Sequence, residues 1–174
     1  MGRKHKAIVT HLEMLSEPHL PPAPRPLGNY ALMQAISPPV HFYRYLYDVV
    51  GREYIWVNRK KLSDQALASI IQHDDVRIFV LYSNGAPAGF FELDFRSHPH
   101  AEFSFLGLMP EHIGKGIGRF LLREGISYAW QQGISRLIIQ TCTLDHPNAL
   151  PLYQRNGFSP YGQEEVILEE PDNN

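Results

Sequence analysis

Three glycines occupy every second position of the segment HIGKGIGRFLL, residues 112–122, immediately before a helix-forming stretch. A helix N-terminus presents up to four backbone N–H groups without intrahelical partners, and the aligned peptide dipoles add partial positive charge there. Because Gly114, Gly116 and Gly118 carry no side chains, a phosphate can approach these N–H groups closely. The spacing therefore predicts a binding site for a phosphate-bearing ligand.

Two widespread phosphate-binding patterns do not match this loop. A Walker loop places Ser or Thr after its lysine, but Lys115 is followed by Gly116. The dinucleotide-binding turn has the spacing G-x-G-x-x-G and an acidic residue about 20 positions later. The spacing G-x-G-x-G fits neither of them.

A third pattern does match. The runs AEFSFLGLMPEHIGKGIGRFLL, residues 101–122, and ALPLYQRNGF, residues 149–158, resemble the GNAT superfamily of acyl-CoA-dependent N-acetyltransferases. The family loop reads Arg or Gln, two residues, Gly, one residue, then Gly or Ala, and it aligns with residues 113–118. The resemblance runs from about Val76 to Phe158 and is weak before Val76. It implies that the loop binds the pyrophosphate of acetyl-CoA, the cosubstrate of the family.

The resemblance also implies which residues contact the coenzyme. Ile113 replaces the family's Arg or Gln, which removes a side-chain contact and leaves the backbone amides intact. A strand is expected to open near Gly107 and Leu108, where a backbone N–H would bind the thioester carbonyl. His146 replaces a family asparagine, and a helix-capping or surface role stays open for it. The expected contacts are Gly107, Leu108, Ile113, Gly114, Lys115, Gly116, Ile117, Gly118, His146 and Asn148.

Acetyl transfer to an amine needs a base and a proton donor. An alkylammonium with a pKa of about 10.4 is only about 0.04% neutral at pH 7, so a base assists the attack. Glu102 stands where histone-modifying members of the family carry a glutamate base. A surface carboxylate without a catalytic role is the alternative. By resemblance, Tyr153 is the acid that protonates the leaving thiolate. Packing of Tyr153 against the core is the alternative.

The acceptor amine is not defined by the sequence. Glu92 and Asp94 alternate with apolar residues and therefore point to one face of their strand, where we expect exposure to solvent. If that face lined the acceptor cleft, it would favour a cationic amine. Four aromatic side chains fit either a core or a substrate wall: Tyr43, Tyr45, Tyr47 and Trp56. A small-molecule amine and a peptide amine both stay open.

Metal and thiol chemistry are not expected. His98, His100 and Glu102 would share one strand face, a spacing acceptable for a divalent metal, but nine histidines make such spacings common by chance. Cys142 is the single cysteine and lies in the apolar run RLIIQTCTL, so we expect a buried, inert thiol. Direct transfer in a ternary complex is therefore expected, without a covalent enzyme intermediate.

Composition limits the class of protein. The 174 residues, 44% of them hydrophobic, suffice for one domain covering residues 1–174. Sixteen basic residues against 18 acidic ones, without a dense basic run beyond the N-terminus, exclude the charge pattern of a nucleic-acid binder. The first apolar stretch is short and interrupted by His11 and Glu13, so we expect no membrane partner and a cytoplasmic location. Oligomeric state stays open, with a homodimer among the options.

The hydrophobic patterns predict an α/β layer fold. Asn84-Gly85 predicts the turn of a hairpin, and residues 136–144 predict a strand buried on both faces. The proline-rich segment 16–40 reads as an extended connection that does not pack. Helices are expected at 38–51, 62–73, 118–132 and 148–157, and strands at 7–15, 76–83, 86–95, 100–109, 136–144 and 158–170. The resemblance implies the GNAT arrangement, a mixed, mostly antiparallel central sheet flanked by helices.

The sequence thus predicts an N-acetyltransferase that transfers an acetyl group from acetyl-CoA to a primary amine. A non-catalytic acyl-CoA-binding or sensor module on the same fold is the alternative. Glu102 and Tyr153 favour the enzyme, because a module that only binds has no use for a proton donor at the thiolate. The preferred acyl chain length stays open.

Overall fold

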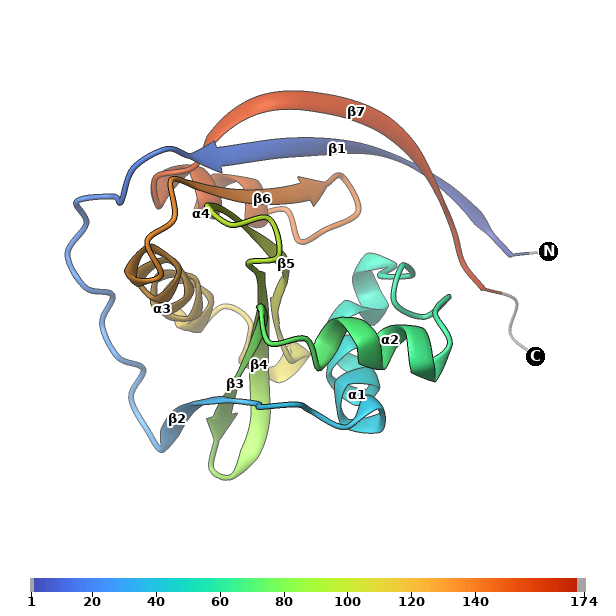
Figure 1. Ribbon diagram of the computed structural model, residues 1–174, viewed down its shortest axis with the longest axis horizontal. Helices are drawn as coiled ribbons and strands as arrows, with labels where there is room; N and C mark the ends of the chain where they lie inside the picture. The colour runs from blue at the N-terminus through green and yellow to red at the C-terminus, as the bar shows by residue number, and fades with distance from the viewer. Residues whose placement is uncertain (1, 172–174) are drawn as a thin grey trace.

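A single seven-stranded sheet forms the centre of the computed structural model, which describes residues 2–171 (Figure 1). The strands are β1 (Lys4–Met14), β2 (Tyr30–Gln34), β3 (Val76–Ser83), β4 (Ala86–Asp94), β5 (His100–Leu108), β6 (Arg136–Cys142) and β7 (Ser159–Glu169). Their order is β2-β3-β4-β5-β6-β1-β7, and neighbours are antiparallel except β5 and β6, which are parallel. The expected mixed, mostly antiparallel sheet is confirmed.

Helices cover both faces of this sheet (Figure 1). They are α1 (Val40–Gly51), α2 (Asp64–Ile71), α3 (Ile117–Gln131) and α4 (Ala149–Arg155), with short 3-10 turns η1 (Arg52–Tyr54) and η2 (Pro110–His112). Successive side chains of a strand point to opposite faces. In β4, Phe91 accordingly joins the core beneath α3, whereas Phe90 joins the core beneath α1 and α2.

The expected hairpin is confirmed. Asn84 and Gly85 both have positive φ, 50° and 84°, between the paired ends of β3 and β4 at Ser83 and Ala86. Two consecutive residues with positive φ match the turn whose twist suits a two-residue hairpin. The hairpin holds β4 in the middle of the sheet, next to the strand that carries the site.

The proline-rich segment 16–40 is not entirely an unpacked connection, as predicted, because it contains β2. Residues 30–34 follow the last of the clustered prolines, so every N–H is available, and they pair antiparallel with β3 at the sheet edge. The part before β2 crosses the outer side of α3 (Figure 1), where Arg123 donates a hydrogen bond to the carbonyl of Pro21.

Strand β6 is not buried on both faces, contrary to the prediction. Leu137 and Ile139 are buried, whereas Gln140 is exposed. The reason lies in the neighbouring strand: β5 pairs with β6 only as far as Phe103 and Ile139, beyond which β6 borders an open space.

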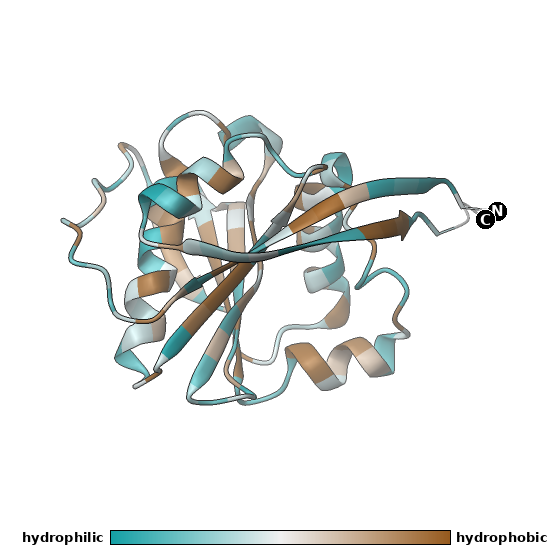
Figure 2. Cartoon of the chain, turned by 90° about the horizontal axis from the view of Figure 1, so that it is seen from above, coloured by the Kyte–Doolittle hydropathy of each residue, from teal (hydrophilic) through white to brown (hydrophobic). Residues whose placement is uncertain are grey.

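The ends of β1 and β7 form a two-stranded ribbon beyond the rest of the sheet (Figure 2). Residues 9–14 of β1 pair with β6, whereas residues 4–8 pair in the sheet with β7 alone. None of the helices within residues 2–171 has the length and apolar character needed to span a membrane.

Candidate active site

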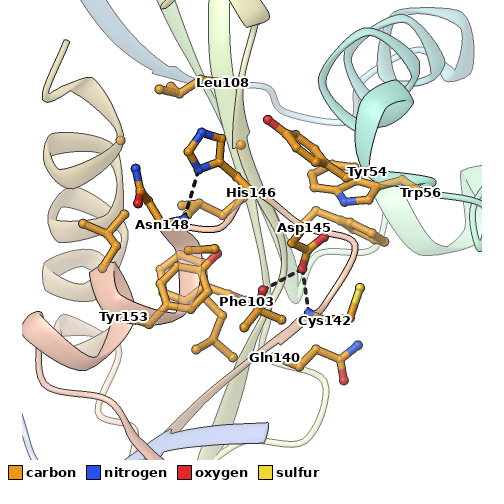
Figure 3. Close-up of a pocket in the computed structure, with 18 of the residues that line it drawn as sticks. Tyr54, Trp56, Phe103, Leu108, Gln140, Cys142, Asp145, His146, Asn148 and Tyr153 are labelled. Atoms are coloured by element: carbon orange, nitrogen blue, oxygen red, sulfur yellow. Dashed lines mark hydrogen bonds between the residues drawn. The ribbon is translucent and has the colours of Figure 1, made fainter. Parts of the chain in front are cut away.

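A gap between β5 and β6 is the centre of the site. The two strands pair from His100–Arg136 to Phe103–Ile139 and then separate, while β5 stays paired with β4 as far as Leu108. The pairing of β4 with β5 shifts register at Ser104, and such a bulge bends a strand. A cavity of about 1100 Å³ fills the gap and extends to the start of α3 (Figure 3).

One edge of this cavity offers a backbone amide. The N–H of Met109 donates to the carbonyl of Ala88 on β4 at 2.8 Å. Because successive amides of a strand point to alternate sides, the N–H of Leu108 faces away from β4, toward the gap. Gly107 also lines the cavity, and a Cβ there would lie 2.4 Å from Cγ1 of Val50. The structure thus brings both expected strand residues to the cavity.

The start of α3 borders the same cavity. The helix begins at Ile117 with Gly116 as N-cap, and Gly114 and Gly116 have φ of 82° and 76°, a conformation that favours glycine. No side chain caps the helix. A Cβ on Gly118 would meet no protein atom closer than 3.7 Å, so the missing side chain widens the cavity instead of relieving a clash. The residues present therefore fit the pyrophosphate of a coenzyme.

The other expected coenzyme contacts divide into two groups. Ile113, His146 and Asn148 line the cavity. The Nδ1 of His146 also accepts a hydrogen bond from the backbone N–H of Asn148 at 3.1 Å, at the start of α4. Lys115 is exposed and Ile117 is buried in the core, and neither side chain lines the cavity.

Three arginines of the cavity wall were missed by the sequence reasoning: Arg119, Arg123 and Arg155. Arg119 and Arg123 stand one turn apart on α3, so helical spacing from the glycine loop could have indicated them. Nε of Arg123 donates to Oδ1 of Asn156 at 2.7 Å. Together the arginines add positive charge to the wall of the cavity at its α3 end, which suits an anionic ligand.

Tyr153 lies on α4 and lines the cavity from the side opposite Tyr54 and Trp56 (Figure 3). Its ring packs in the core at 7% exposure, edge-on to Phe158, so core packing and a role in the site coincide. Burial, and next the charge of Asp145, raise the pKa of Tyr153 well above its ordinary value. The hydroxyl is therefore protonated at neutral pH and can donate.

Asp145 was not singled out by the sequence reasoning. It follows β6 and lines the cavity, and its Oδ2 accepts hydrogen bonds from Oγ1 of Thr141 at 2.7 Å and from the N–H of Cys142 at 2.9 Å (Figure 3). An acidic residue three positions after the end of β6 was the available signal. Without knowledge of the gap, this signal could not be read.

Cys142 is half-buried and lines the cavity, so the expectation of a buried thiol is wrong. Its strand face opens onto the space left by β5. Burial, followed by the charge of Asp145, raises the pKa of the thiol. The thiolate, which is the nucleophilic form, is thereby disfavoured, in agreement with transfer without a covalent enzyme intermediate.

Glu102, the sequence candidate for the base, is half-buried on β5 and does not line the cavity. It pairs in register with Asp94, and burial, followed by the charge of Asp94, raises the pKa of its carboxyl group. Its role stays a prediction.

Glu92 is fully buried, so the expectation that it faces solvent is wrong. Its Oε1 accepts a hydrogen bond from Oη of Tyr43 at 2.5 Å, and its Oε2 lies 2.6 Å from Nη2 of Arg59. Alternation along β4 gave the correct face, but α1 and the segment after it cover that face. Asp94, nearer the end of the strand, pairs with Arg96 at 2.7 Å.

The end of the cavity away from the arginines has aromatic and apolar walls. Residues 54–57 line it, together with Val9 of β1, Leu168 of β7, Phe103 and Phe105. The ring of Tyr54 stands edge-on to that of His146, with 6.4 Å between centroids.

Ile55 lies in the left-handed region at φ 57°, which is a strained position for a β-branched residue. It separates two aromatic residues that both line the cavity, Tyr54 and Trp56. Of the other aromatic candidates, Tyr47 lines the cavity, Tyr43 is buried in the core, and Tyr45 is exposed.

His98, His100 and Glu102 do not share one strand face as expected, because β5 begins at His100 and His98 lies in the preceding turn. Among residues 2–171, no group of three or more His, Cys, Asp or Glu side chains is arranged to hold a metal ion.

Comparison with known proteins identifies the family. The model of the Acetyltransferase (GNAT) family matches residues 41–158, more than half of the chain. The chain belongs to the GNAT acetyltransferase family. It is 26% identical over 123 residues to an uncharacterized N-acetyltransferase of Methanocaldococcus jannaschii, covering 67% of this chain and 53% of that one. It is also 29% identical over 97 residues to streptothricin acetyltransferase of Streptomyces lavendulae, covering 55% and 51%.

A solved GNAT structure shares the fold. The GCN5-related N-acetyltransferase from Sphaerobacter thermophilus aligns with a TM-score of 0.68 at 18% identity, covering 95% of this chain and 51% of that one. The chain spans about half the length of the two curated relatives, from Methanocaldococcus jannaschii and Streptomyces lavendulae. Family membership supports acyltransferase activity for this GNAT protein.

Proposed function

We propose that this GNAT protein transfers an acetyl group from acetyl-CoA to a primary amine by direct attack in a ternary complex. The observation that carries the proposal is the continuity of one cavity. It joins the glycine-lined start of α3 to the aromatic-walled space that Asp145 and Tyr153 both line. A phosphate-bearing acyl donor and a separate acceptor can therefore occupy it together.

The end of the cavity near α3 suits the diphosphate of coenzyme A. The unpaired N–H groups and dipole of α3 favour an anion, and Arg119, Arg123 and Arg155 add positive charge along the wall. The gap between β5 and β6 would hold the pantetheine arm. The thioester carbonyl would then lie beside the N–H of Leu108.

The chemistry of the transfer assigns roles to this chain's own groups. As the nitrogen lone pair forms a bond to the thioester carbon, negative charge develops on the carbonyl oxygen, where the N–H of Leu108 can stabilise it. When the carbon–sulfur bond breaks, the electron pair stays on sulfur. Tyr153, protonated at neutral pH, can donate its proton to this thiolate.

Two measurements on the purified chain test this proposal. Titration calorimetry should show binding of acetyl-CoA, and a thiol-release assay over a panel of primary amines should show coenzyme A formed only when an accepted amine is present. Binding without transfer to any amine would instead indicate a non-catalytic acyl-CoA-binding module. No binding of either acetyl-CoA or coenzyme A would contradict the proposal altogether.

A further inference from the structure

Asp145 presents one fixed and one available carboxylate oxygen at the cavity. Oδ2 is held by Oγ1 of Thr141 and the N–H of Cys142 at 2.7 and 2.9 Å, whereas neither of these bonds uses Oδ1 (Figure 3). A carboxylate fixed in this way is oriented before a substrate arrives. Its charge acts on groups from three sides of the cavity, since it contributes to the raised pKa values of Tyr54, Cys142 and Tyr153.

The charge balance of the cavity is unusual for a site that binds a cation. Among the described residues that line it, Asp145 is the single carboxylate. Apart from His146, the basic side chains among these residues are three arginines. Glu92 and Glu102 lie outside this wall, and Glu92 is already paired with Arg59. An acceptor with two or more positive charges would therefore find a carboxylate partner for one of them and none for the rest.

The walls around the acceptor end favour an apolar body. Residues 54–57 contribute two aromatic rings, and Phe103, Phe105 and Leu168 add further apolar surface. Trp56 lies 5.0 Å from Phe105, centroid to centroid, so the two rings form one continuous surface. Aromatic surfaces of this kind bind apolar and aromatic groups by area and ring geometry.

On these grounds we infer that Asp145 accepts the proton of the attacking amine, and that the acceptor is an amine with one positive charge on an aromatic or apolar body. The inference rests on the proposed function. The bound ammonium first releases one proton to solvent, and the neutral amine then donates an N–H hydrogen bond to Oδ1. As the N–C bond forms, the nitrogen becomes acidic and its proton passes to Oδ1. The carbonyl then reforms, the C–S bond breaks, and Tyr153 protonates the sulfur. Proton exchange with solvent restores both residues.

The positions of Asp145 and Tyr153 also couple the two proton transfers. Burial is the main reason that the pKa of the Tyr153 hydroxyl is raised, and the negative charge of Asp145, which lines the same cavity, adds to it. Once Asp145 holds the proton of the amine, this charge is gone, and Tyr153 becomes a better acid at the step when the sulfur leaves. Coenzyme A and the acetamide are the net products, with no proton gained or lost by the enzyme.

The experiment compares Asp145→Asn with Glu102→Gln in the full chain. The thiol-release assay uses acetyl-CoA with 2-phenylethylamine, and with spermidine as the polycationic probe. Asparagine keeps an oxygen that can accept from Thr141, and calorimetry with acetyl-CoA together with thermal unfolding verifies each variant. We expect Asp145→Asn to lower kcat roughly 100-fold, the range of a general base, and Glu102→Gln to lower it much less. The wild-type protein should favour 2-phenylethylamine over spermidine in kcat/KM by roughly tenfold or more.

Opposite results overturn the inference. Full turnover of a folded Asp145→Asn variant, or loss in Glu102→Gln alone, would remove Asp145 from the chemistry. Wild-type preference for spermidine over 2-phenylethylamine would contradict the acceptor class, and this result tests the acceptor class even if Asp145→Asn does not fold. In each of these cases acetyl transfer still occurs and the proposed function stands. Failure to transfer to any amine would instead overturn the proposed function itself.

Discussion

The two ends of the cavity are built in different ways. The end at α3 is formed by one stretch of chain, residues 107–118, in which four glycines line the cavity, together with the arginine side chains of α3 and α4. The acceptor end is formed by side chains from four distant places: Val9, residues 54–57, residues 103–105 and Leu168. Under the proposed function, this contrast explains how the coenzyme end stays the same across the family while the acceptor end changes by substitution of side chains.

The acceptor end also depends on buried charge and strain. The pair of Arg59 and Glu92 fixes the segment after α1 against β4, and Tyr43 binds the same carboxylate. Ile55 holds a left-handed conformation within this segment. The α3 end needs no such support, because a helix start and two glycines with positive φ define it.

The largest effect should follow from breaking that buried pair. Arg59→Met leaves the carboxylate of Glu92 buried without its cation, and we expect the free energy of unfolding to fall by about 3–5 kcal/mol. Urea denaturation measures the change. The control is Arg96→Met, whose pair with Asp94 is more exposed and should cost at most about 1 kcal/mol. Equal small losses in both variants would show that the acceptor end does not depend on this pair.

The α3 end can be tested with two glycines in the same conformation. Gly116 and Gly133 have φ of 76° and 73°, and neither would bring a Cβ within 4 Å of another group. Leucine at either position should cost about 1–2 kcal/mol of stability through backbone strain. Only Gly116→Leu should weaken acetyl-CoA binding, roughly 10³-fold, because it obstructs charge-assisted hydrogen bonds at the helix start. Calorimetry that finds equal affinities for both variants would contradict the assignment.

Tyr153→Phe sharpens the distinction between binding and chemistry. The ring keeps its contact with Phe158, while the proton donor is lost. We expect kcat to fall roughly 100-fold, with the dissociation constant of acetyl-CoA unchanged. Tyr45→Phe, at an exposed tyrosine, is the matched control and should leave kcat unaltered. An unchanged kcat in Tyr153→Phe would remove this hydroxyl from the mechanism.

The smallest effect is expected at Gly118. Alanine there meets protein atoms only at ordinary contact distance, and it favours the helix by about 1 kcal/mol. Stability should therefore be kept or raised. The added methyl group should weaken acetyl-CoA binding roughly tenfold, because it keeps the diphosphate from hydrogen-bond distance of the backbone N–H groups. Gly125→Ala provides the opposite case, because its Cβ would lie 2.6 Å from the ring of Phe103. It should lower the melting temperature instead.

Local patterns in the sequence predicted most of the fold. The hairpin turn at Asn84-Gly85, the start of α3 and the mixed sheet were correct, because each depends on residues close together in the chain or on the family motif. Strand β2 was missed because the surrounding prolines obscured five residues that are free to pair.

The site could be predicted only in part, because local patterns do not show which distant segments of the chain meet. The cavity includes Tyr153 and the glycine loop, which lie in contiguous motifs. The exposure of Asp145 to the cavity depends on where β5 separates from β6, and the burial of Glu92 depends on Arg59 and Tyr43; hydrophobic alternation along one strand reports neither. Alternation assigns the face of a strand but does not show which segments cover that face.

The most direct test of the central claim is a crystal structure of the protein with acetyl-CoA bound. The account predicts the diphosphate within hydrogen-bond distance of the backbone N–H groups of residues 114–118, and the thioester carbonyl facing the N–H of Leu108. The methyl end should point toward Asp145 and the aromatic walls. A diphosphate bound away from the start of α3, with the gap between β5 and β6 empty, would contradict it.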